Sequence, residues 1–269
     1  MKALRANGQI LHVADEGARD GLPVVFSNSL GTDFRLWDPM LPHLPSGLRL
    51  IRYDKRGHGL STCPDGPYSI EDHRQDLEGV LDQLGIKQAV IVGLSVGGMI
   101  TQALAAVRPD LARGLVLCDT GHVIGPPEIW DARVEAIQKG GIGSLSDAIL
   151  ERWFSTNFHR DRAEELALWR SMLTRTPVEG YIGTCRAIQK ADLTETTRRL
   201  AMPTICVVGS EDGATTPDLV RSTAALLGTE CIEIEGAGHL PCVEAPAVLA
   251  DIIKTFLQEN GFDGSRTAV

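Results

Sequence analysis

The sequence predicts an α/β fold, a mostly parallel, doubly wound sheet with a helical lid inserted after the sixth strand. Short, nearly continuous apolar runs alternate with amphipathic, helix-like segments along the chain. Strands that are apolar on both faces belong in a sheet covered by helices on each side. A long stretch then loses the strand signal before strand-like runs return. The length of 269 residues is within reach of one large α/β domain.

The strand-like runs can be placed in order. Asn7-Gly8 lies between alternating residues and predicts an opening β-hairpin. Between two later runs, residues 69–85 predict a helix that Ser69 caps and Gly85 ends. The apolar strand-like runs are "PVVFSNS" (23–29), "LRLIRYD" (48–54), "QAVIVG" (88–93), "GLVLCD" (114–119), "PTICVVGS" (203–210) and "ECIEIEG" (230–236).

The loss of strand signal defines the expected domain organisation. Residues 1–120 and 197–269 should form the sheet-containing core. Residues 121–196, which hold three of the four tryptophans, should form a helical cap over the ends of the strands. The final stretch "GFDGSRTAV" is typical of a frayed tail.

Composition excludes several classes of function. The formal net charge of −9 argues against nucleic acid or an anionic membrane surface as a partner. No stretch approaches the roughly 18 apolar residues of a membrane span, and the N-terminus lacks an apolar core of signal-peptide length. Six cysteines are scattered without a metal-like cluster, so we expect reduced thiols, no metal and a cytoplasmic location. The sequence leaves the oligomeric state open, including a homo-oligomer.

A serine lies where a nucleophile would be mounted. Gly93-Leu94-Ser95-Val96-Gly97 fits G-x-S-x-G between a buried strand and an apolar helix. On such a bend the serine backbone is strained, and glycine is needed on both sides because side chains would clash. The alternative is a glycine-rich turn that only packs helix on strand. A serine hydroxyl also needs a base to remove its proton.

The base is sought among seven histidines. His239, in "EGAGHLPCVEAP", follows the last predicted strand and precedes the last predicted helix. In a parallel sheet this is the edge where the serine bend also emerges. His58, in the turn "YDKRGHGLS", is the alternative.

The histidine needs a carboxylate that fixes its tautomer. Asp212 directly follows the next-to-last strand and is the preferred candidate, with Asp119 after "GLVLC" as the alternative. Negative charge that develops on a substrate oxygen needs preorganised donors. The backbone N–H groups of Val96 and Leu30 are the expected donors, although "SNSLG" is also ordinary turn sequence.

Together these motifs resemble the α/β-hydrolase family, from about residue 3 to residue 257. The matches are "GLSVGG", "YDKRGHGLS", "GSEDGATTP" and "GAGHLPCVEAP". A closer resemblance is to the 3-oxoadipate enol-lactonases, which act late in aromatic catabolism (the β-ketoadipate pathway). It rests on "SNSLGTDFRLW", "RYDKRGHGLS", "GPYSIEDHRQDL", "CDTGHVIGPPEIWDARVEAI" and "RWFSTNF". Two positions depart from those lactonases: Val96 replaces their usual methionine, and Asp119 replaces their more frequent asparagine.

The resemblance implies a mechanism and a substrate class. Ser95 would attack the lactone carbonyl and form an acyl-enzyme that water then cleaves, without metal or organic cofactor. The substrate would be a small anionic lactone, whose free carboxylate suits an arginine. The candidates in the cap are Arg133 and Arg152, with Trp130 and Trp153 as apolar walls, although all four also suit simple packing of helix faces. Asp54 and Arg56 are interpreted as structural, because they hold the turn that supports the elbow.

Other readings remain open. The same serine, acid and histidine would serve a carboxylesterase, a carbon–carbon bond hydrolase acting on ring-cleavage products, or a perhydrolase. A non-catalytic member of the fold that only binds a ligand is a further alternative. Turnover of an activated ester that is lost in Ser95→Ala separates an enzyme from a binder.

Overall fold

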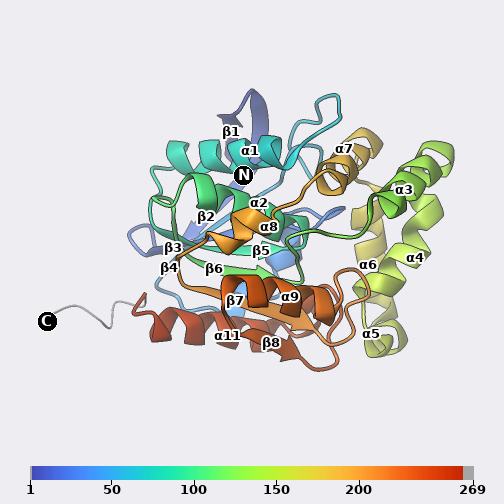
Figure 1. Cartoon of the computed structure of the whole chain (residues 1–269). Helices are drawn as coiled ribbons and strands as arrows, with labels where there is room; N and C mark the ends of the chain where they lie inside the picture. Colours follow the sequence, from blue (N-terminus) through green and yellow to red (C-terminus); the bar gives the residue numbers. More distant parts are fainter. Residues whose placement is uncertain (1, 263–269) are drawn as a thin grey trace, which may run out of the picture.

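A central sheet of eight strands organises the chain, of which this computed structural model describes residues 2–262 (Figure 1). The strand order is β1-β2-β4-β3-β5-β6-β7-β8, and only the β1–β2 and β2–β4 pairs are antiparallel. The predicted mostly parallel α/β sheet is therefore confirmed. The strands are β1 (Lys2–Ala6), β2 (Gln9–Gly17), β3 (Leu22–Ser27), β4 (Leu48–Tyr53), β5 (Ala89–Leu94), β6 (Ala112–Cys118), β7 (Thr204–Gly209) and β8 (Cys231–Ile234).

The opening hairpin and the first helix follow local sequence signals. Asn7 and Gly8 both adopt positive φ angles, 44° and 75°, as a tight hairpin turn requires. Helix α1 (Ile70–Gln83) begins with a capping box, in which the Ser69 hydroxyl accepts from the Asp72 N–H at 3.1 Å. Gly85 follows the helix at φ 64°, so the predicted end of this helix is confirmed.

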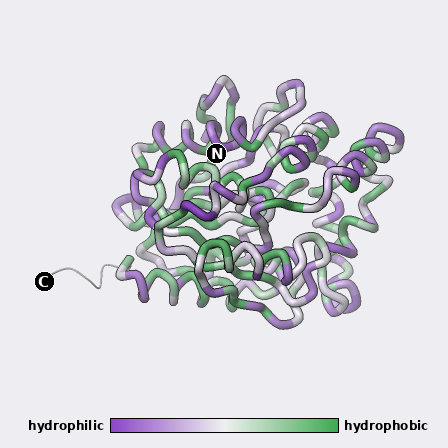
Figure 2. The backbone as a smooth tube through the Cα atoms, in the orientation of Figure 1, coloured by the Kyte–Doolittle hydropathy of each residue, from purple (hydrophilic) through white to green (hydrophobic). Residues whose placement is uncertain are grey.

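Helices cover both faces of the sheet. Helices α1, α2 (Val96–Val107), α8 (Thr194–Arg198) and α9 (Pro217–Leu227) form successive neighbours on one face. Helix α11 (Pro246–Glu259) runs along the opposite face, below the sheet in Figure 1. Hydrophobic residues concentrate along the strands between these two layers (Figure 2).

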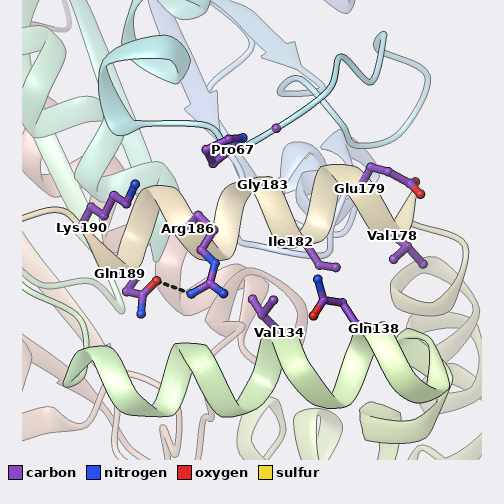
Figure 3. A pocket seen from close by; sticks show the side chains of 11 residues that line it. Pro67, Val134, Gln138, Val178, Glu179, Ile182, Gly183, Arg186, Gln189 and Lys190 are labelled. Carbon is purple, nitrogen blue, oxygen red and sulfur yellow. Dashed lines mark hydrogen bonds between the residues drawn. The ribbon is translucent and has the colours of Figure 1, made fainter.

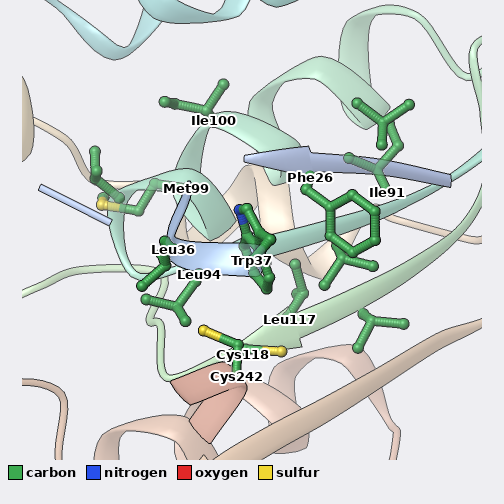
Figure 4. Packing of buried hydrophobic residues seen from close by; sticks show 14 of the residues in the cluster. Phe26, Leu36, Trp37, Ile91, Leu94, Met99, Ile100, Leu117, Cys118 and Cys242 are labelled. Atoms are coloured by element: carbon green, nitrogen blue, oxygen red, sulfur yellow. The ribbon is translucent and has the colours of Figure 1, made fainter. Parts of the chain in front are cut away.

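Strand β5 lies between β3 and β6 in the sheet, and its six residues are all buried. The Phe26 and Trp37 rings lie 5.0 Å apart beside β5 residues such as Ile91 (Figure 4). Trp37 belongs to the short 3-10 helix η1 (Phe34–Trp37), and η2 (Leu41–His43) follows it. This packing supports the elbow at the end of β5.

The segment between β6 and β7 is helical. It holds α3 (Pro127–Gly140), η3 (Ile142–Leu145), α4 (Ser146–Trp153), α5 (Thr156–Asp161), α6 (Ala163–Thr174) and α7 (Val178–Gln189) before α8. We call α3 to α7 the cap; Figure 1 shows it at one end of the sheet. The expected boundary after residue 196 falls inside α8, which packs on α2 and α9 and so belongs with the core layer.

The C-terminal end differs in part from expectation. Phe262 is buried, and its ring packs against Phe256 at 6.0 Å and beneath the Arg113 guanidinium at 4.5 Å. The predicted frayed tail is therefore wrong for Phe262, while residues 263–269 lie outside the described part of the chain. Among residues 2–262, no helix combines the length and the apolar character that crossing a bilayer requires. All six cysteines fall within this range and are free thiols.

Candidate active site

Ser95 occupies a strained bend between β5 and α2. Its backbone has φ 58° and ψ −122°, a conformation that L-residues rarely adopt. A Cβ atom on Gly97 would lie 2.0 Å from the Ser27 carbonyl oxygen, and one on Gly93 would lie 2.6 Å from the Gly97 oxygen. Both positions therefore require glycine, and the bend has the geometry of a nucleophile elbow.

The last residue of β6 and the loop after it hold the Ser95 backbone. Its N–H donates to the Cys118 carbonyl oxygen at 3.0 Å, and the Thr120 hydroxyl donates to its carbonyl oxygen at 2.6 Å. The Ser95 side chain does not cap helix α2. It lines a cavity of about 50 Å³ that His239 also lines.

His239 and Asp212 form a buried hydrogen-bonded pair. Asp212 follows β7, and His239 follows β8, the strand paired with β7. The His239 Nδ1 atom lies 2.9 Å from Asp212 Oδ2. The other Asp212 oxygen, Oδ1, accepts from the N–H groups of Ala214 at 2.7 Å and Thr215 at 3.0 Å. The Thr215 hydroxyl donates to Oδ2 at 2.6 Å.

Electrostatics favours an ionised Asp212. Burial alone would raise the pKa of this carboxyl, but the adjacent His239 imidazole and the Thr215 donors lower the pKa below its usual value. An ionised Asp212 only accepts, so Nδ1 of His239 must carry the proton. The Nε2 atom of His239 is then free to accept a proton on the cavity side, where the Ser29 hydroxyl lies 3.4 Å away.

Asp119 lies close to this pair but is bonded differently. Its Oδ1 atom accepts from the Gly209 N–H at 2.9 Å, while its buried Oδ2 atom has no partner among the described residues. Burial first, and then the charge of Asp212, raise the pKa of Asp119 well above its usual value. The alternative placement of Asp119 as the carboxylate partner of His239 therefore has no hydrogen bond to support it.

These three groups also form the one cluster of metal-ligand type among residues 2–262. Ligand atoms of Asp119, Asp212 and His239 all lie within 4.8 Å of one another. His239 Nδ1 is already committed to Asp212, and the raised pKa of Asp119 disfavours the ionised carboxylate that a metal ion would need. The donor set suits a proton-bearing network better than a cation.

His58, the alternative base, serves a loop instead. Its Nε2 atom accepts from the Gly31 N–H at 3.0 Å, and its Nδ1 atom lies 3.1 Å from the Arg56 carbonyl oxygen. Burial lowers the pKa of His58 well below its usual value, so the ring is neutral. Both ring nitrogens are therefore occupied away from Ser95.

The loop that His58 contacts, residues 28–32, carries one of the predicted backbone donors. Asn28 anchors the loop, because its Nδ2 donates to the Tyr53 carbonyl oxygen at 2.8 Å and its Oδ1 accepts from Trp37 Nε1 at 2.7 Å. Leu30 lines the cavity, and its N–H has no acceptor among residues 2–262. The N–H of Val96, the first residue of α2, lacks an acceptor within its helix.

The cap supplies the four predicted substrate-binding residues, and all four line the cavity. Arg152 Nε donates to the Gly213 carbonyl oxygen at 2.7 Å, so it ties α4 to the Asp212 loop. The Arg133 guanidinium lies 4.9 Å from the Trp130 ring and forms no ion pair with the described residues. The Trp153 carbonyl oxygen accepts from the His239 N–H at 2.8 Å, so Trp153 positions His239 as well as lining the cavity.

Sequence reasoning missed Tyr181 and Thr215. Tyr181, from α7, lines the cavity and is fully buried with a hydroxyl that has no partner within residues 2–262. Thr215 braces Asp212. Tyr181 lies within a helical pattern that carries no signal of cavity lining, whereas the position of Thr215 shortly after Asp212 could have been read as a support.

Asp54 and Arg56 have structural partners. Arg56 forms a two-pronged bond with Asp76, with both nitrogen–oxygen distances at 2.7 Å. Asp54 accepts from the Phe34 N–H at 2.8 Å and the Leu60 N–H at 3.0 Å. These contacts fix the turn that carries His58.

A larger cavity lies elsewhere. A groove of about 760 Å³ runs between α3 and α7, near Pro67, and shares no lining residue with the Ser95 cavity (Figure 3). Its polar groups include Arg186, which bonds to Gln189. No hydroxyl lies beside a histidine in this groove, so its lining residues offer no nucleophile and base.

The fold and the nucleophile elbow together indicate a family of proteins. A family model described as the alpha/beta hydrolase family matches residues 24–252. The chain therefore belongs to the α/β-hydrolase family.

Three individual proteins are similar to this chain over nearly its whole length. Two relatives from Acinetobacter baylyi are named 3-oxoadipate enol-lactonase 2 and 3-oxoadipate enol-lactonase 1. The chain is 29% identical to the first, with 95% of this chain and 96% of the relative covered. It is 30% identical to the second, with 93% and 94% covered. The crystal structure of the enol-lactonase from Burkholderia xenovorans LB400 superposes with a TM-score of 0.92 at 36% identity, covering 96% of this chain and all of that one.

Proposed function

We propose that the protein is a serine hydrolase that opens 3-oxoadipate enol-lactone to 3-oxoadipate, a reaction of aromatic catabolism. The observation that carries the proposal is the Asp212–His239 pair, bonded at 2.9 Å, in a cavity that Ser95 enters from a strained elbow. The similarity to enol-lactonases over nearly the whole chain supports the choice of substrate. The free thiols are compatible with a cytoplasmic enzyme.

The chemistry proceeds in two halves. His239 Nε2 takes the Ser95 proton as the serine oxygen bonds to the lactone carbonyl carbon. The N–H groups of Leu30 and Val96 stabilise the resulting oxyanion. The ring carbon–oxygen bond then breaks to release a stable enolate, which needs little help from an acid to leave and then takes the proton from His239, giving the enol and restoring the neutral base. Water next gives a proton to His239 as its oxygen bonds to the acyl carbon, and the Ser95 oxygen leaves and takes that proton back. The product enol tautomerises to the keto acid, and no metal or organic cofactor takes part.

Arg133 is the proposed partner of the free substrate carboxylate. Arg152 already donates to the carbonyl oxygens of Gly213 and Ala214, at 2.7 and 3.4 Å. Arg133 is partly buried, lines the cavity and forms no ion pair with the described residues, so no protein carboxylate competes for its guanidinium. The unpartnered Tyr181 hydroxyl offers a further donor beside it. Trp130 and Trp153 supply apolar walls.

The cavity is small for the proposed substrate, so the proposal includes a step that lets the lactone enter. Sites for small molecules typically enclose about 300 Å³ or more, whereas this cavity is about 50 Å³. Cap and core must therefore separate locally before the lactone can bind. The Trp153–His239 contact lies on the boundary between them.

The test is hydrolysis of purified 3-oxoadipate enol-lactone, followed by the loss of its ultraviolet absorbance. The proposal predicts kcat/KM at or above about 10⁴ M⁻¹s⁻¹ and its loss in Ser95→Ala. p-Nitrophenyl acetate serves as the control substrate. Ester turnover that depends on Ser95 without lactone turnover would keep the nucleophile and reject the substrate. Activity that survives Ser95→Ala on both substrates would reject the mechanism.

A further inference from the structure

A buried lysine lies directly behind the loop that carries the Leu30 N–H. Lys55 follows β4, and 1% of its surface is exposed. Its ammonium group donates to the Ser29 carbonyl oxygen at 2.5 Å and to the Thr32 carbonyl oxygen at 3.3 Å. Both acceptors belong to the loop of residues 28–32.

This ammonium has no carboxylate in contact with it. Among the described residues, no salt bridge includes Lys55, although the charges of Asp54 and Asp33 act on it from farther away. Asp54 is bonded to His12 and Asp33 to Arg35. Burying a cation without a paired anion is expensive, and two carbonyl dipoles offset only part of that expense. A lysine that served packing alone would be replaced at lower free energy by an apolar side chain.

The Lys55 ammonium lies where it can act on the peptide group that joins Ser29 to Leu30. The Ser29 carbonyl and the Leu30 N–H belong to the same planar trans peptide, so they point in opposite directions. Lys55 binds the carbonyl oxygen from behind, while Leu30 lines the cavity shared with Ser95. A cation on a carbonyl oxygen draws electron density from the peptide and makes its N–H a stronger donor.

We propose that Lys55 is a positioning residue that orients and polarises the Ser29–Leu30 peptide, so that the Leu30 N–H stabilises the oxyanion more strongly. This role rests on the proposed function only as far as Leu30 contributes to the oxyanion hole. It does not depend on which ester or lactone is the substrate.

The role predicts a characteristic dependence on pH. Burial lowers the pKa of Lys55 to about 7, an effect that Asp54 and Asp33 partly oppose. Two further groups face it, His58 and His73, and both are neutral because burial lowers their pKa values. The ammonium is therefore present below about pH 7 and is lost as the pH rises above that value. The contribution of Lys55 to catalysis should disappear over the same range.

The loop should keep its fold without the ammonium. The Thr32 hydroxyl also donates to the Ser29 carbonyl oxygen, at 2.8 Å. The Gly31 N–H is held separately by His58. Lys55→Met, which keeps the length of the side chain and removes the charge, is therefore a suitable variant. Tyr53→Phe is the matched control, because it removes a buried hydroxyl that contacts Ser27 rather than this loop.

The experiment compares wild type and Lys55→Met with p-nitrophenyl acetate at about pH 6 and about pH 9. The ratio of kcat/KM for the two proteins at one pH cancels every effect of pH that they share. We expect kcat to fall about tenfold at the lower pH, a part of the loss expected when a whole donor is removed, with KM little changed. We expect the ratio to approach one at the higher pH. Tyr53→Phe should give a ratio near one at both values.

A ratio that is the same at both pH values, or a loss that appears only in KM, would overturn the proposal. Lys55→Arg provides a second test, because the arginine stays charged at both pH values. At about pH 9 this variant should keep the rate contribution of the cation, which wild type loses. If Lys55→Met fails to fold, the comparison of wild type with Lys55→Arg still decides the question. Failure of the proposed function would show separately, as ester hydrolysis that persists in Ser95→Ala.

Discussion

The Nδ1 atom of His239 lies 2.9 Å from Oδ2 of Asp212, although 27 residues separate the two in the chain. Both side chains are almost fully buried. Two adjacent parallel strands, β7 and β8, bring them together, because each residue follows the carboxyl end of its strand. The pair therefore depends on the topology of the sheet rather than on a local turn.

Asp212 should be indispensable for catalysis, whereas Asp119 should not be. Asp212→Asn removes the acceptor that fixes the His239 tautomer, and we expect kcat to fall by about 10⁴-fold. Asp119→Asn should keep kcat within a few-fold of wild type, because Asp119 bonds to the Gly209 N–H and not to His239. Steady-state kinetics of ester hydrolysis for both variants tests this assignment. A larger loss in Asp119→Asn than in Asp212→Asn would reverse it.

Asp119 should make the protein less stable as the pH rises. The folded state raises the pKa of this carboxyl above that of the unfolded chain, which is about 4, so between the two pKa values the folded state binds more protons than the unfolded chain. The free energy of unfolding then falls with rising pH, by at most about 1.4 kcal/mol per pH unit from this group. Asp119→Asn removes this term.

Urea unfolding at about pH 5 and about pH 7.5 measures the effect. We expect Asp119→Asn to gain stability relative to wild type, with the larger gain at the higher pH. Equal differences at the two pH values would show that Asp119 is ionised in the folded protein.

Gly97 should tolerate no side chain. The Cβ atom of Gly97→Ala would approach the Ser27 carbonyl oxygen to 2.0 Å, and this backbone atom cannot rotate away. We expect a loss of about 3 kcal/mol in the free energy of unfolding, together with a loss of activity. Gly143→Ala is the control, because no atom lies within 4 Å of its Cβ position. A Gly97→Ala protein as stable as the control would show that the elbow has room to relax.

Arg133 should discriminate between charged and neutral substrates. Losing one charge-assisted bond to the substrate carboxylate corresponds to about 1.5–3 kcal/mol. We therefore expect Arg133→Gln to raise KM for the anionic lactone by about 10- to 100-fold. Hydrolysis of the neutral p-nitrophenyl acetate should be unchanged.

Arg152→Gln is the matched comparison. It releases the Gly213 and Ala214 carbonyl oxygens beside Asp212, so it should slow both substrates alike. If Arg133→Gln slows both substrates equally, then Arg133 supports the cap rather than binding the carboxylate.

Much of the fold could be predicted because its signals are local. Apolar runs marked the strands, and Ser69 with Gly85 marked the limits of α1. The cap boundary was harder to place, because α8 belongs with α2 and α9 only through tertiary packing. Phe262 follows the last helix in a polar stretch, and only its tertiary contacts with Phe256 and Arg113 show that it is buried.

The residues of the candidate site likewise fall into those that local sequence predicts and those that only tertiary contacts reveal. G-x-S-x-G located Ser95 because the backbone of the bend dictates glycine at fixed spacing. Chain order alone could not choose between Asp119 and Asp212; their hydrogen bonds distinguish them. Lys55 and Tyr181 gave no signal, since their importance lies in burial beside loops that are distant in sequence.

The identity of the nucleophile is the central claim, and the structure offers two serines to test. Ser29 Oγ lies 3.4 Å from His239 Nε2, while Ser95 occupies the elbow of the same cavity. Treatment with a fluorophosphonate, followed by peptide mapping by mass spectrometry, reports which hydroxyl reacts. We predict a single adduct on Ser95 that is absent in His239→Ala and retained in Ser29→Ala. An adduct on Ser29, or labelling that is independent of His239, would contradict the account.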